Sequence, residues 1–401
     1  MKKILIIAHY SGDLENKDNN RYIYIANLLA KKNYNVELIT SDFSHREKKP
    51  KNLQYIEKFP FKTTLINEKG YKNNVSIARL ISHKIMARNL EKKLSEISKP
   101  DLIYCGIPTL NVGKVAAKYA KENNIPFIID ILDLWPEAFQ MILGKNILSS
   151  LLLLPMTINA NEIYRSADGI ISVSETYNNR ALEVNNKAIS KTIYLGTDLD
   201  DFDSYTQSNI FADKKTNEIW VAYAGTLGKS YDLITVIDAL EIINKKVIKD
   251  KEVKLLVMGN GPLENKFKKH AKNKSINAVF TGRLPYNKMA KLLSMSDIAV
   301  NPIIKNSAGS IINKHADYAA AGLPVLNTQE SLEYRKLVEE YNFGYNCNNG
   351  DVIDLANKLQ KLIIDDKIRL KMGENSKRFA LERFNRRYTY TDIIDVIESL
   401  I

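Results

Sequence analysis

A cation and a carboxylate that stand three residues apart in a short helical run are the residues of this chain best suited to chemistry. The run follows small residues at 307–310, contains Lys314 and Asp317, and ends at Gly322. A helix start favours an anion, and side chains at i and i+3 lie on roughly one face of a helix. The pattern indicates a nucleotide site, with the cation at a diphosphate and the carboxylate on a ribose. An ordinary capped helix with a surface ion pair is the alternative.

Short apolar runs alternate with helical patterns in both halves of the 401-residue chain, which is long enough for two domains. Continuous Ile, Val and Leu runs between helices are typical of parallel sheets covered on both faces. The first half has such runs at 2–8, 35–40, 101–106, 126–131 and 169–174. The second half has them at 220–228, 254–261, 278–284, 297–303 and 323–327. We therefore expect an α/β fold with two parallel-sheet domains.

The boundary between the two domains is expected at the acidic, turn-rich segment 195–204. This places the first domain at 1–195 and the second at 196–384. The helical pattern continues to the end of the chain, and the last helix, at about 385–401, could pack back on the first domain. Asp198 and Asp200 form an acidic triplet of a kind that holds a metal in some sugar transferases, and here we interpret it as linker.

The first domain offers polar residues where its strands end. Ligands of parallel sheets bind beyond the carboxyl ends of the strands, which places the loop 9–20 at a crevice. The loop has one glycine, Gly12, so it is no dinucleotide fingerprint. In the segment DLWPE at 133–137, Asp133 and Glu137 flank an apolar corner. The segment is either a structural corner or a contact to a sugar or acceptor.

The second domain has glycines at its strand ends instead. They are Gly225, Gly228, Gly259, Gly261 and Gly282. Glycine at such a position makes a tight turn or lets a ligand approach the backbone. Lys229 directly follows Gly228, so a second cation could face the same crevice as Lys314.

The charge balance indicates anionic partners. The net charge is +12, and residues 43–99 hold 14 Lys and Arg against 5 Asp and Glu. Such a surplus suits anionic substrates, an anionic membrane surface or nucleic acid, or it is simply a solvated face. We expect no nucleic-acid partner, because the chain has no zinc-finger spacing, aromatic RNP-type motif or basic heptad array.

Compartment and membrane contact follow from the cysteines and the apolar runs. Cys105 and Cys347 are far apart and lack metal-ligand spacing, which fits a reducing cytoplasm and no disulfide framework. The apolar run 4–8 is too short for a signal peptide, and no window is long enough for a spanning helix. Residues 146–161 carry no charge and form either a buried helix or a membrane-contacting segment.

These motifs together resemble the retaining glycosyltransferases of family 4. The matching segments are YAGTLG at 223–228, GNGP at 259–262, FTGRLP at 280–285, DIAVNP at 297–302 and DYAAAGLPV at 317–325. DLWPE, YAGTLGK and NKHADYAAAGLPV are similar to the bacterial subgroup that builds capsule, O-antigen and other surface polysaccharides. The family has two glutamates with seven residues between them. The second falls at Asp317, a shorter carboxylate, and the first falls at Gly309.

The resemblance implies the GT-B fold, two Rossmann-like domains facing a central cleft, and transfer of a sugar from a UDP-linked or other nucleotide-diphospho-sugar with retention of configuration. The expected acceptor is a glycan or polyprenyl-linked glycan, at the inner face of the cytoplasmic membrane. Neither a cofactor nor a metal is expected. The catalytic residues implied are Asp133, Lys229 and Lys314, and the acceptor-side residues are Gly12 and Glu137. The donor-binding residues implied are Gly228, Gly259, Arg283, Leu284, Ser310, Ile311, Ile312, Asn313 and Asp317.

Two other functions stay open at this point. One is a nucleotide-sugar 2-epimerase of the same fold, which needs acid and base groups in the crevice. The five histidines, His9, His45, His83, His270 and His315, form no evident set in the sequence. The other is a non-catalytic partner subunit, which the missing first glutamate at Gly309 favours and the intact lysines oppose.

Overall fold

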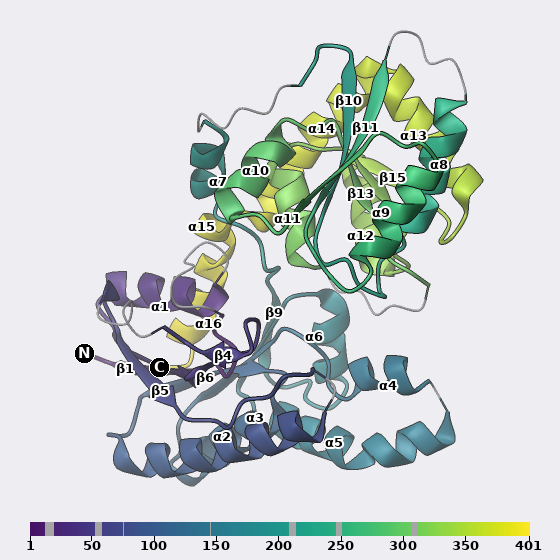
Figure 1. Ribbon diagram of the computed structural model, residues 1–401. Helices are drawn as coiled ribbons and strands as arrows, with labels where there is room; N and C mark the ends of the chain where they lie inside the picture. The colour runs from purple at the N-terminus through teal and green to yellow at the C-terminus, as the bar shows by residue number, and fades with distance from the viewer. Residues whose placement is uncertain are drawn as a thin grey trace. The chain divides into compact units, whose positions relative to one another are not determined.

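The computed structural model describes residues 1–12, 20–52, 58–74, 76–144, 146–207, 214–245, 251–305 and 311–401. These residues divide into two compact units, which are described separately. Unit 1 comprises Met1–Tyr194 and Arg387–Ile401, and unit 2 comprises Leu195–Arg386. Each unit is built on its own parallel sheet, which confirms the predicted α/β fold class (Figure 1).

Unit 1 has a seven-stranded sheet in the order β5-β2-β1-β6-β7-β8-β9, and all neighbouring strands are parallel. Its strands are β1 (Lys3–Ile7), β2 (Asn35–Ser41), β5 (Lys62–Ile66), β6 (Leu102–Ile107), β7 (Phe127–Ile131), β8 (Gly169–Ser172) and β9 (Ile189–Thr192). A small antiparallel pair, β3 (Phe43–Ser44) and β4 (Lys49–Pro50), follows β2. The edge strands β5 and β9 were not predicted.

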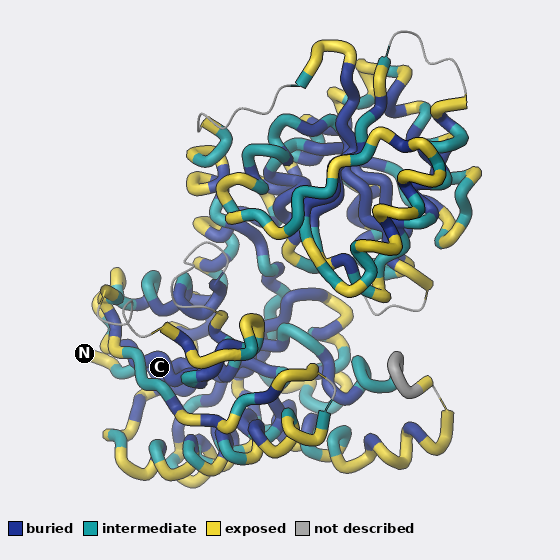
Figure 2. The backbone as a smooth tube through the Cα atoms, viewed as in Figure 1, coloured by how far each residue is buried: buried dark blue, intermediate teal, exposed yellow. Residues whose placement is uncertain are grey.

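The helices of unit 1 lie in two layers, one on each face of the sheet (Figure 1). The helices are α1 (Arg21–Lys31), α2 (Ile77–Glu96), α3 (Leu110–Glu122), α4 (Glu137–Leu143), α5 (Ile147–Arg165), α6 (Glu175–Leu182) and α16 (Thr391–Glu398), with the short α15 (Arg386–Thr389) before α16. One layer contains α2, α3 and α5, and the other contains α1 and α16. The central strands between them are buried, as the dark blue centre of unit 1 shows (Figure 2).

The C-terminal helix is fixed to unit 1 by a buried arginine. The Arg21 guanidinium pairs with Asp130 at 2.7 Å and donates to the Tyr390 hydroxyl at 3.0 Å. It also donates to the carbonyl oxygens of Ile193 and Tyr194, the last residues of the first segment of unit 1. One cation thus joins the first helix, the sheet and the chain's final segment.

Unit 2 has a six-stranded parallel sheet in the order β12-β11-β10-β13-β14-β15. Its strands are β10 (Glu218–Ala224), β11 (Glu252–Met258), β12 (Ala278–Gly282), β13 (Ile298–Asn301), β14 (Val325–Asn327) and β15 (Gly344–Asn346). β10, next to the centre, is buried on both faces, whereas the short edge strand β15 was not predicted.

The helices of unit 2 also cover both faces of its sheet. They are α7 (Leu199–Thr206), α8 (Leu233–Asn244), α9 (Glu264–Asn273), α10 (Tyr286–Ser294), α11 (Asn313–Ala320), α12 (Leu332–Tyr341), α13 (Val352–Ile364) and α14 (Asp366–Phe379), which continues into a π-helical turn (Ala380–Phe384). One face carries α8, α9 and α13, and the other carries α10, α11 and α14 (Figure 1). Asp198 accepts a hydrogen bond from the Asp201 amide as the N-cap of α7.

Candidate functional site

Lys314 lies at the start of α11 with its amine buried and without a polar partner. Its side chain is 7% exposed, and Nζ has no hydrogen-bond partner among the described residues. Nζ lies 3.9 Å from the ring centroid of Tyr231 and 4.7 Å from that of Tyr223. Burial lowers the pKa of this amine well below its usual value. An amine held in this way is ready to accept an anion, which would supply the missing partner and restore its charge.

Asp317 lies one turn further along α11 and is engaged within unit 2. It is 5% exposed and accepts a hydrogen bond from the Tyr286 hydroxyl at 2.7 Å, and that hydroxyl also bonds Thr197 at 2.8 Å. Burial raises the pKa of Asp317 to about 6, against the hydrogen bond from Tyr286 and the positive charge of Arg386. Lys314 and Asp317 therefore face different neighbours, and a surface ion pair is not formed between them.

Two glycine turns shape the backbone beside Lys314. Gly225 follows β10 and Gly259 follows β11, with φ values of +148° and +147°. A Cβ at Gly259 would lie 1.8 Å from the carbonyl oxygen of Gly225, and a Cβ at Gly225 would lie 3.8 Å from Lys314 Nζ. Larger residues would force the two strand ends apart. Glycine at both positions keeps the backbone close to the amine, as expected where a ligand approaches the main chain.

The other predicted donor-side residues differ in exposure. Lys229 and Asn313 are exposed, Gly228, Leu284 and Ile312 are half-buried, Ile311 is buried, and Arg283 is exposed and bonded. The Ile312 amide donates to His315 Nδ1 at 3.3 Å, so it is already engaged in capping α11. Ser310 and Gly309 lie outside the described residues. The predicted donor-side residues that the structure describes all follow the end of a strand or begin α11, so they lie at the carboxyl edge of the sheet.

Unit 1 has a cavity of its own at the carboxyl ends of its strands. It has a volume of about 240 Å³. Its lining includes Asp133 after β7, His9 after β1 and Thr109 at the start of α3. Asp133 accepts hydrogen bonds from the Leu134 amide and from Trp135 Nε1. Burial raises the pKa of Asp133, although these hydrogen bonds and Arg79 oppose the shift.

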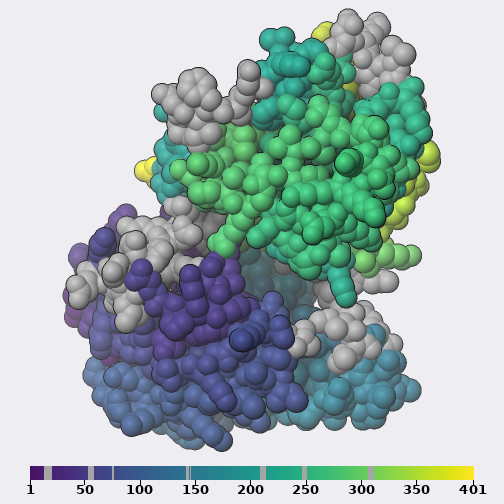
Figure 3. Space-filling model, in the orientation of Figure 1, coloured from purple at the N-terminus to yellow at the C-terminus, as the bar shows by residue number. Residues whose placement is uncertain are grey.

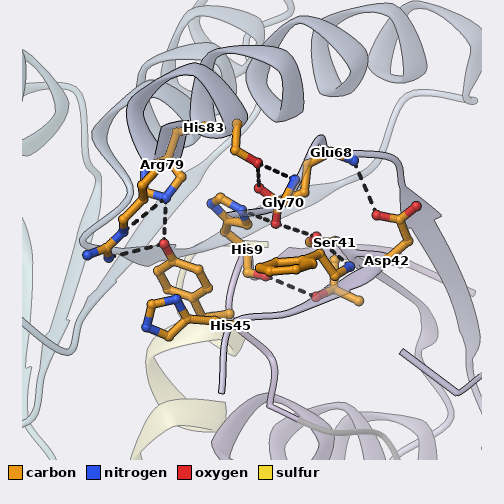
Figure 4. A network of polar contacts seen from close by, with 12 residues as sticks. His9, Ser41, Asp42, His45, Glu68, Gly70, Arg79 and His83 are labelled. Atoms are coloured by element: carbon orange, nitrogen blue, oxygen red, sulfur yellow. Dashed lines mark hydrogen bonds and ion pairs between the residues drawn. The ribbon is translucent and has the colours of Figure 1, made fainter. Parts of the chain in front are cut away.

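Three of the five histidines gather beside this cavity, so the expectation that the histidines form no set was wrong. His9 Nε2 bonds Glu68 at 3.0 Å, and Tyr10 Oη bonds His83 Nε2 at 2.6 Å (Figure 4). The His45 ring lies 4.6 Å from that of Tyr10. Burial and nearby cations lower the pKa of His45 to about 4 and that of His83 to about 3, so both rings are neutral at neutral pH.

The remaining acceptor-side residues do not join this cluster. Glu137 pairs with Arg180 at 2.5 Å and is not among the residues that line the cavity. Gly12 has a positive φ of +72° and is exposed, next to residues 13–19, which are outside the described part of the chain. Asp133 and Glu137, which the sequence places four residues apart, thus have different surroundings.

Comparison with known proteins finds that the chain is similar to glycosyltransferases. Residues 206–379 match the family model for "Glycosyl transferases group 1". A stretch of 242 residues is 26% identical to an uncharacterized glycosyltransferase of Methanocaldococcus jannaschii and spans 60% of both chains. The chain thus aligns with less than two thirds of that protein's length.

Solved structures show the fold of the whole chain. Sucrose-phosphate synthase from Thermosynechococcus elongatus superposes with a TM-score of 0.73 at 17% identity, covering 100% of this chain and 99% of the other. Anabaena HepE in complex with UDP and glucose superposes with a TM-score of 0.70 at 17% identity, covering 100% of both chains. The likeness covers both sheets, and each unit is Rossmann-like, as in the GT-B fold.

Proposed function

From the match of residues 206–379 to the family model for group 1 glycosyl transferases, we propose that the chain is an active sugar transferase. It takes a sugar from a nucleotide-diphospho-sugar, UDP-linked, and moves it with retention of configuration to a glycan or lipid-linked acceptor. The reaction belongs to the synthesis of a bacterial surface polysaccharide. Support for this last step comes from the segments DLWPE, YAGTLGK and NKHADYAAAGLPV, which are similar to enzymes of that role.

The single observation that carries the proposal is the buried amine of Lys314, which has no hydrogen-bond partner among the residues that the structure describes. A diphosphate beside Nζ would pair with it and hold it protonated, since an opposite charge within a few ångströms favours the charged form. During transfer, negative charge grows on the departing diphosphate, so the same amine becomes more strongly bound as the sugar leaves. HepE, which shares the fold, was solved with UDP, which supports UDP as the nucleotide.

The other residues have supporting roles in this proposal. The backbone at Gly228 and Gly259, with Ile311, Ile312 and Asn313, contacts the donor, and the exposed Lys229 adds a second cation. Arg283 and Leu284 meet the base. Asp317 holds the ribose only if it exchanges its bond from Tyr286 for a bond from the sugar. In unit 1, Asp133 orients the acceptor, with Gly12 and Glu137 around it. No metal is required, because the lysines neutralise the diphosphate.

A lipid-linked acceptor fits an exposed apolar surface of unit 1. The first turns of α5 lie at the surface (Figure 3). Four of their side chains are more than 60% exposed: Ile147, Leu148, Leu151 and Leu152. α3 packs between α2 and α5, and α2 carries the exposed cations Lys84, Arg88 and Lys92. Apolar side chains with cations in one helical layer suit the interface of an anionic membrane. Among the described helices, none has both the length and the apolar character needed to cross one.

The proposal is tested with a panel of nucleotide-sugars in a thermal-shift assay, followed by transfer to lipid-extract acceptors. A ligand at about 100 times its Kd stabilises the fold by about 2.7 kcal/mol. We expect UDP-sugars to raise Tm more than nucleotides with other bases, and NMR of the product to show the donor's anomeric configuration. Failure of every nucleotide-sugar to shift Tm or to react would refute the proposal.

The histidine cluster keeps a second function open, a nucleotide-sugar 2-epimerase. His9, His83 and Asp133 place acid and base groups around one cavity of unit 1. Incubation with UDP-N-acetylglucosamine in the absence of any acceptor separates the two functions. Formation of the C2 epimer would establish the epimerase, and recovery of unchanged donor, or its slow hydrolysis, would favour the transferase.

A further inference from the structure

The cavity of unit 1 contains two buried polar atoms that have no partner in the part of the chain that the structure describes. They are His9 Nδ1 and Thr109 Oγ1, on side chains from residues that are 2% and 1% exposed. Both residues line the same cavity, although they come from the ends of different strands. A buried polar atom without a partner is costly, so two in one cavity indicate a ligand that satisfies them.

Glu68 determines which nitrogen of His9 is left for that ligand. The carboxylate accepts bonds from Ser41 Oγ and Ser82 Oγ, each at 2.6 Å, as well as from His9 Nε2 (Figure 4). Burial opposes the charge of Glu68, but these hydrogen bonds and the neighbouring His9 ring prevail and lower its pKa to about 2. Since an ionised carboxylate only accepts, Nε2 carries a hydrogen and is engaged, and Nδ1 is the ring nitrogen left for the ligand. A hydroxyl group, which can donate as well as accept, is a fitting partner for it.

Thr109 stands at the N-cap of α3 but does not cap it. Its hydroxyl makes no bond to the first turn of that helix, although threonine at this position commonly does so. The hydroxyl is therefore free to donate to, or accept from, a ligand in the cavity. Because the hydroxyl makes no bond within the described ranges of the chain, its removal should cost the folded protein nothing.

The rest of the lining describes the chemistry of the ligand. Among the described lining residues, Arg79 and Asp133 carry opposite formal charges, so the wall has no excess of either sign. The rings of Tyr10, Tyr22, His45 and Trp135 form much of the remainder. One water needs about 10–15 Å³, so 240 Å³ leaves room for a ring-sized ligand. An aromatic wall with a few directed polar atoms fits an uncharged, hydroxyl-bearing ring better than a phosphate.

We propose that this cavity binds an uncharged sugar ring of the acceptor, with one hydroxyl bonded to His9 Nδ1 and another bonded to Thr109 Oγ1. The identification of the ring as the acceptor's rests on the proposed transferase function. The binding itself does not, because it involves unit 1 alone and needs no nucleotide. His9 and Glu68 thus act as a pair in which the carboxylate fixes the ring and the ring orients the sugar.

Binding is measured on the full chain without nucleotide, by ligand-observed NMR with methyl glycosides of glucose, galactose and N-acetylglucosamine. Glucose 1-phosphate and inorganic phosphate serve as charged probes. Thr109→Val removes the unpartnered hydroxyl at nearly constant volume, and Thr109→Ser restores it. Thr63→Val is the matched control, because Thr63 Oγ1 is also buried and unpartnered but lies on β5, outside this lining.

We expect at least one methyl glycoside to bind the wild type, and Thr109→Val to weaken its binding about threefold to tenfold, the worth of one neutral hydrogen bond. Tm should stay the same or rise, and Thr109→Ser and Thr63→Val should bind as the wild type does. Equal affinity in Thr109→Val, binding of the charged probes alone, or no binding of any probe would each overturn the proposal. A parallel titration with UDP reports on unit 2, so its failure would count against the transferase and the acceptor identity of the ring, while the binding of a sugar ring in this cavity would still stand.

Discussion

Replacement of Lys314 by methionine should make the protein more stable and less active at once. Methionine matches the length and volume of the lysine stem and keeps its packing on Tyr223 and Tyr231. The substitution removes an amine that is 7% exposed and has no described hydrogen-bond partner. In the absence of ligand, that amine destabilises the folded state, because an unsatisfied buried polar group costs about 1–3 kcal/mol.

The stability gained by Lys314→Met should depend on pH, and the pKa of the amine gives the direction of that dependence. The unfolded chain holds a proton on the amine below its ordinary pKa of about 10.4, whereas burial lowers the pKa in the folded state. Between the lowered pKa of the folded state and about 10.4, unfolding therefore takes up a proton, and the penalty shrinks as pH rises through this range. Lys314→Met should accordingly raise the free energy of unfolding by about 1–3 kcal/mol at pH 7, or Tm by several degrees, and by less at pH 10.

The loss of activity follows from the same amine. One directed donor to a developing negative charge is worth about 10²-fold to 10³-fold in turnover. We expect Lys314→Met and Lys314→Ala to lose at least about 10²-fold in kcat and to bind UDP more weakly. Lys288→Met, an exposed lysine on α10, is the control for the assay. Wild-type turnover in Lys314→Met would remove Lys314 from the site, and a lower Tm would show that the amine has a partner within the fold.

Three further predictions concern other parts of the chain. Asp317→Asn should stabilise the protein by about 2–3 kcal/mol above pH 6 and should have no such effect below pH 4. The pKa of Asp317 is about 6 in the folded chain and about 3.9 in the unfolded chain, so ionisation of the carboxyl costs stability as pH rises through that window. Urea unfolding at several pH values measures the difference in the free energy of unfolding. Leu151→Ser with Leu152→Ser should reduce co-sedimentation with anionic vesicles severalfold, whereas Leu370→Ser, an equally exposed leucine of unit 2, should not. Chelation with EDTA should leave transfer within about twofold of its rate, and recovery by added Mg²⁺ would contradict a metal-free reaction.

The sequence predicted the buried strands of both sheets and missed strands at their edges. Central strands such as β1 and β10 are continuous apolar runs, because both of their faces are covered. The edge strands β5, β9 and β15 read KTTLI, ISKT and GYN, with partly exposed residues and little apolar periodicity. Their pairing is decided by the neighbouring strand, which a local pattern does not report.

The environment of Lys314 was predictable only in part. A cation after small residues at a helix start indicated an anion site. The amine does lie buried beside the glycine turns of β10 and β11, with no partner in the described part of the chain. The pairing of Asp317 with Tyr286, by contrast, joins residues 31 positions apart. Such a contact depends on how α10 and α11 pack on one face of the sheet, and the spacing of residues along α11 does not predict it.

The histidine cluster shows how one missed strand can hide a site. Ile7 on β1 pairs with Ile39 on β2, so His9, two residues on, lies opposite Ser41. Ser41 in turn pairs with Ile66 at the end of β5, and Glu68 follows two residues later. Ile66 is thus the β5 residue in register with His9, and Glu68 lies two residues further along. The carboxyl ends of parallel strands meet at the same edge of a sheet, so placing β5 beside β2 brings Glu68 to the edge where His9 lies. Without β5, Glu68 belonged to an unassigned basic stretch, and His9 had no visible carboxylate partner. The pair was therefore encoded in the strand order and not in any motif.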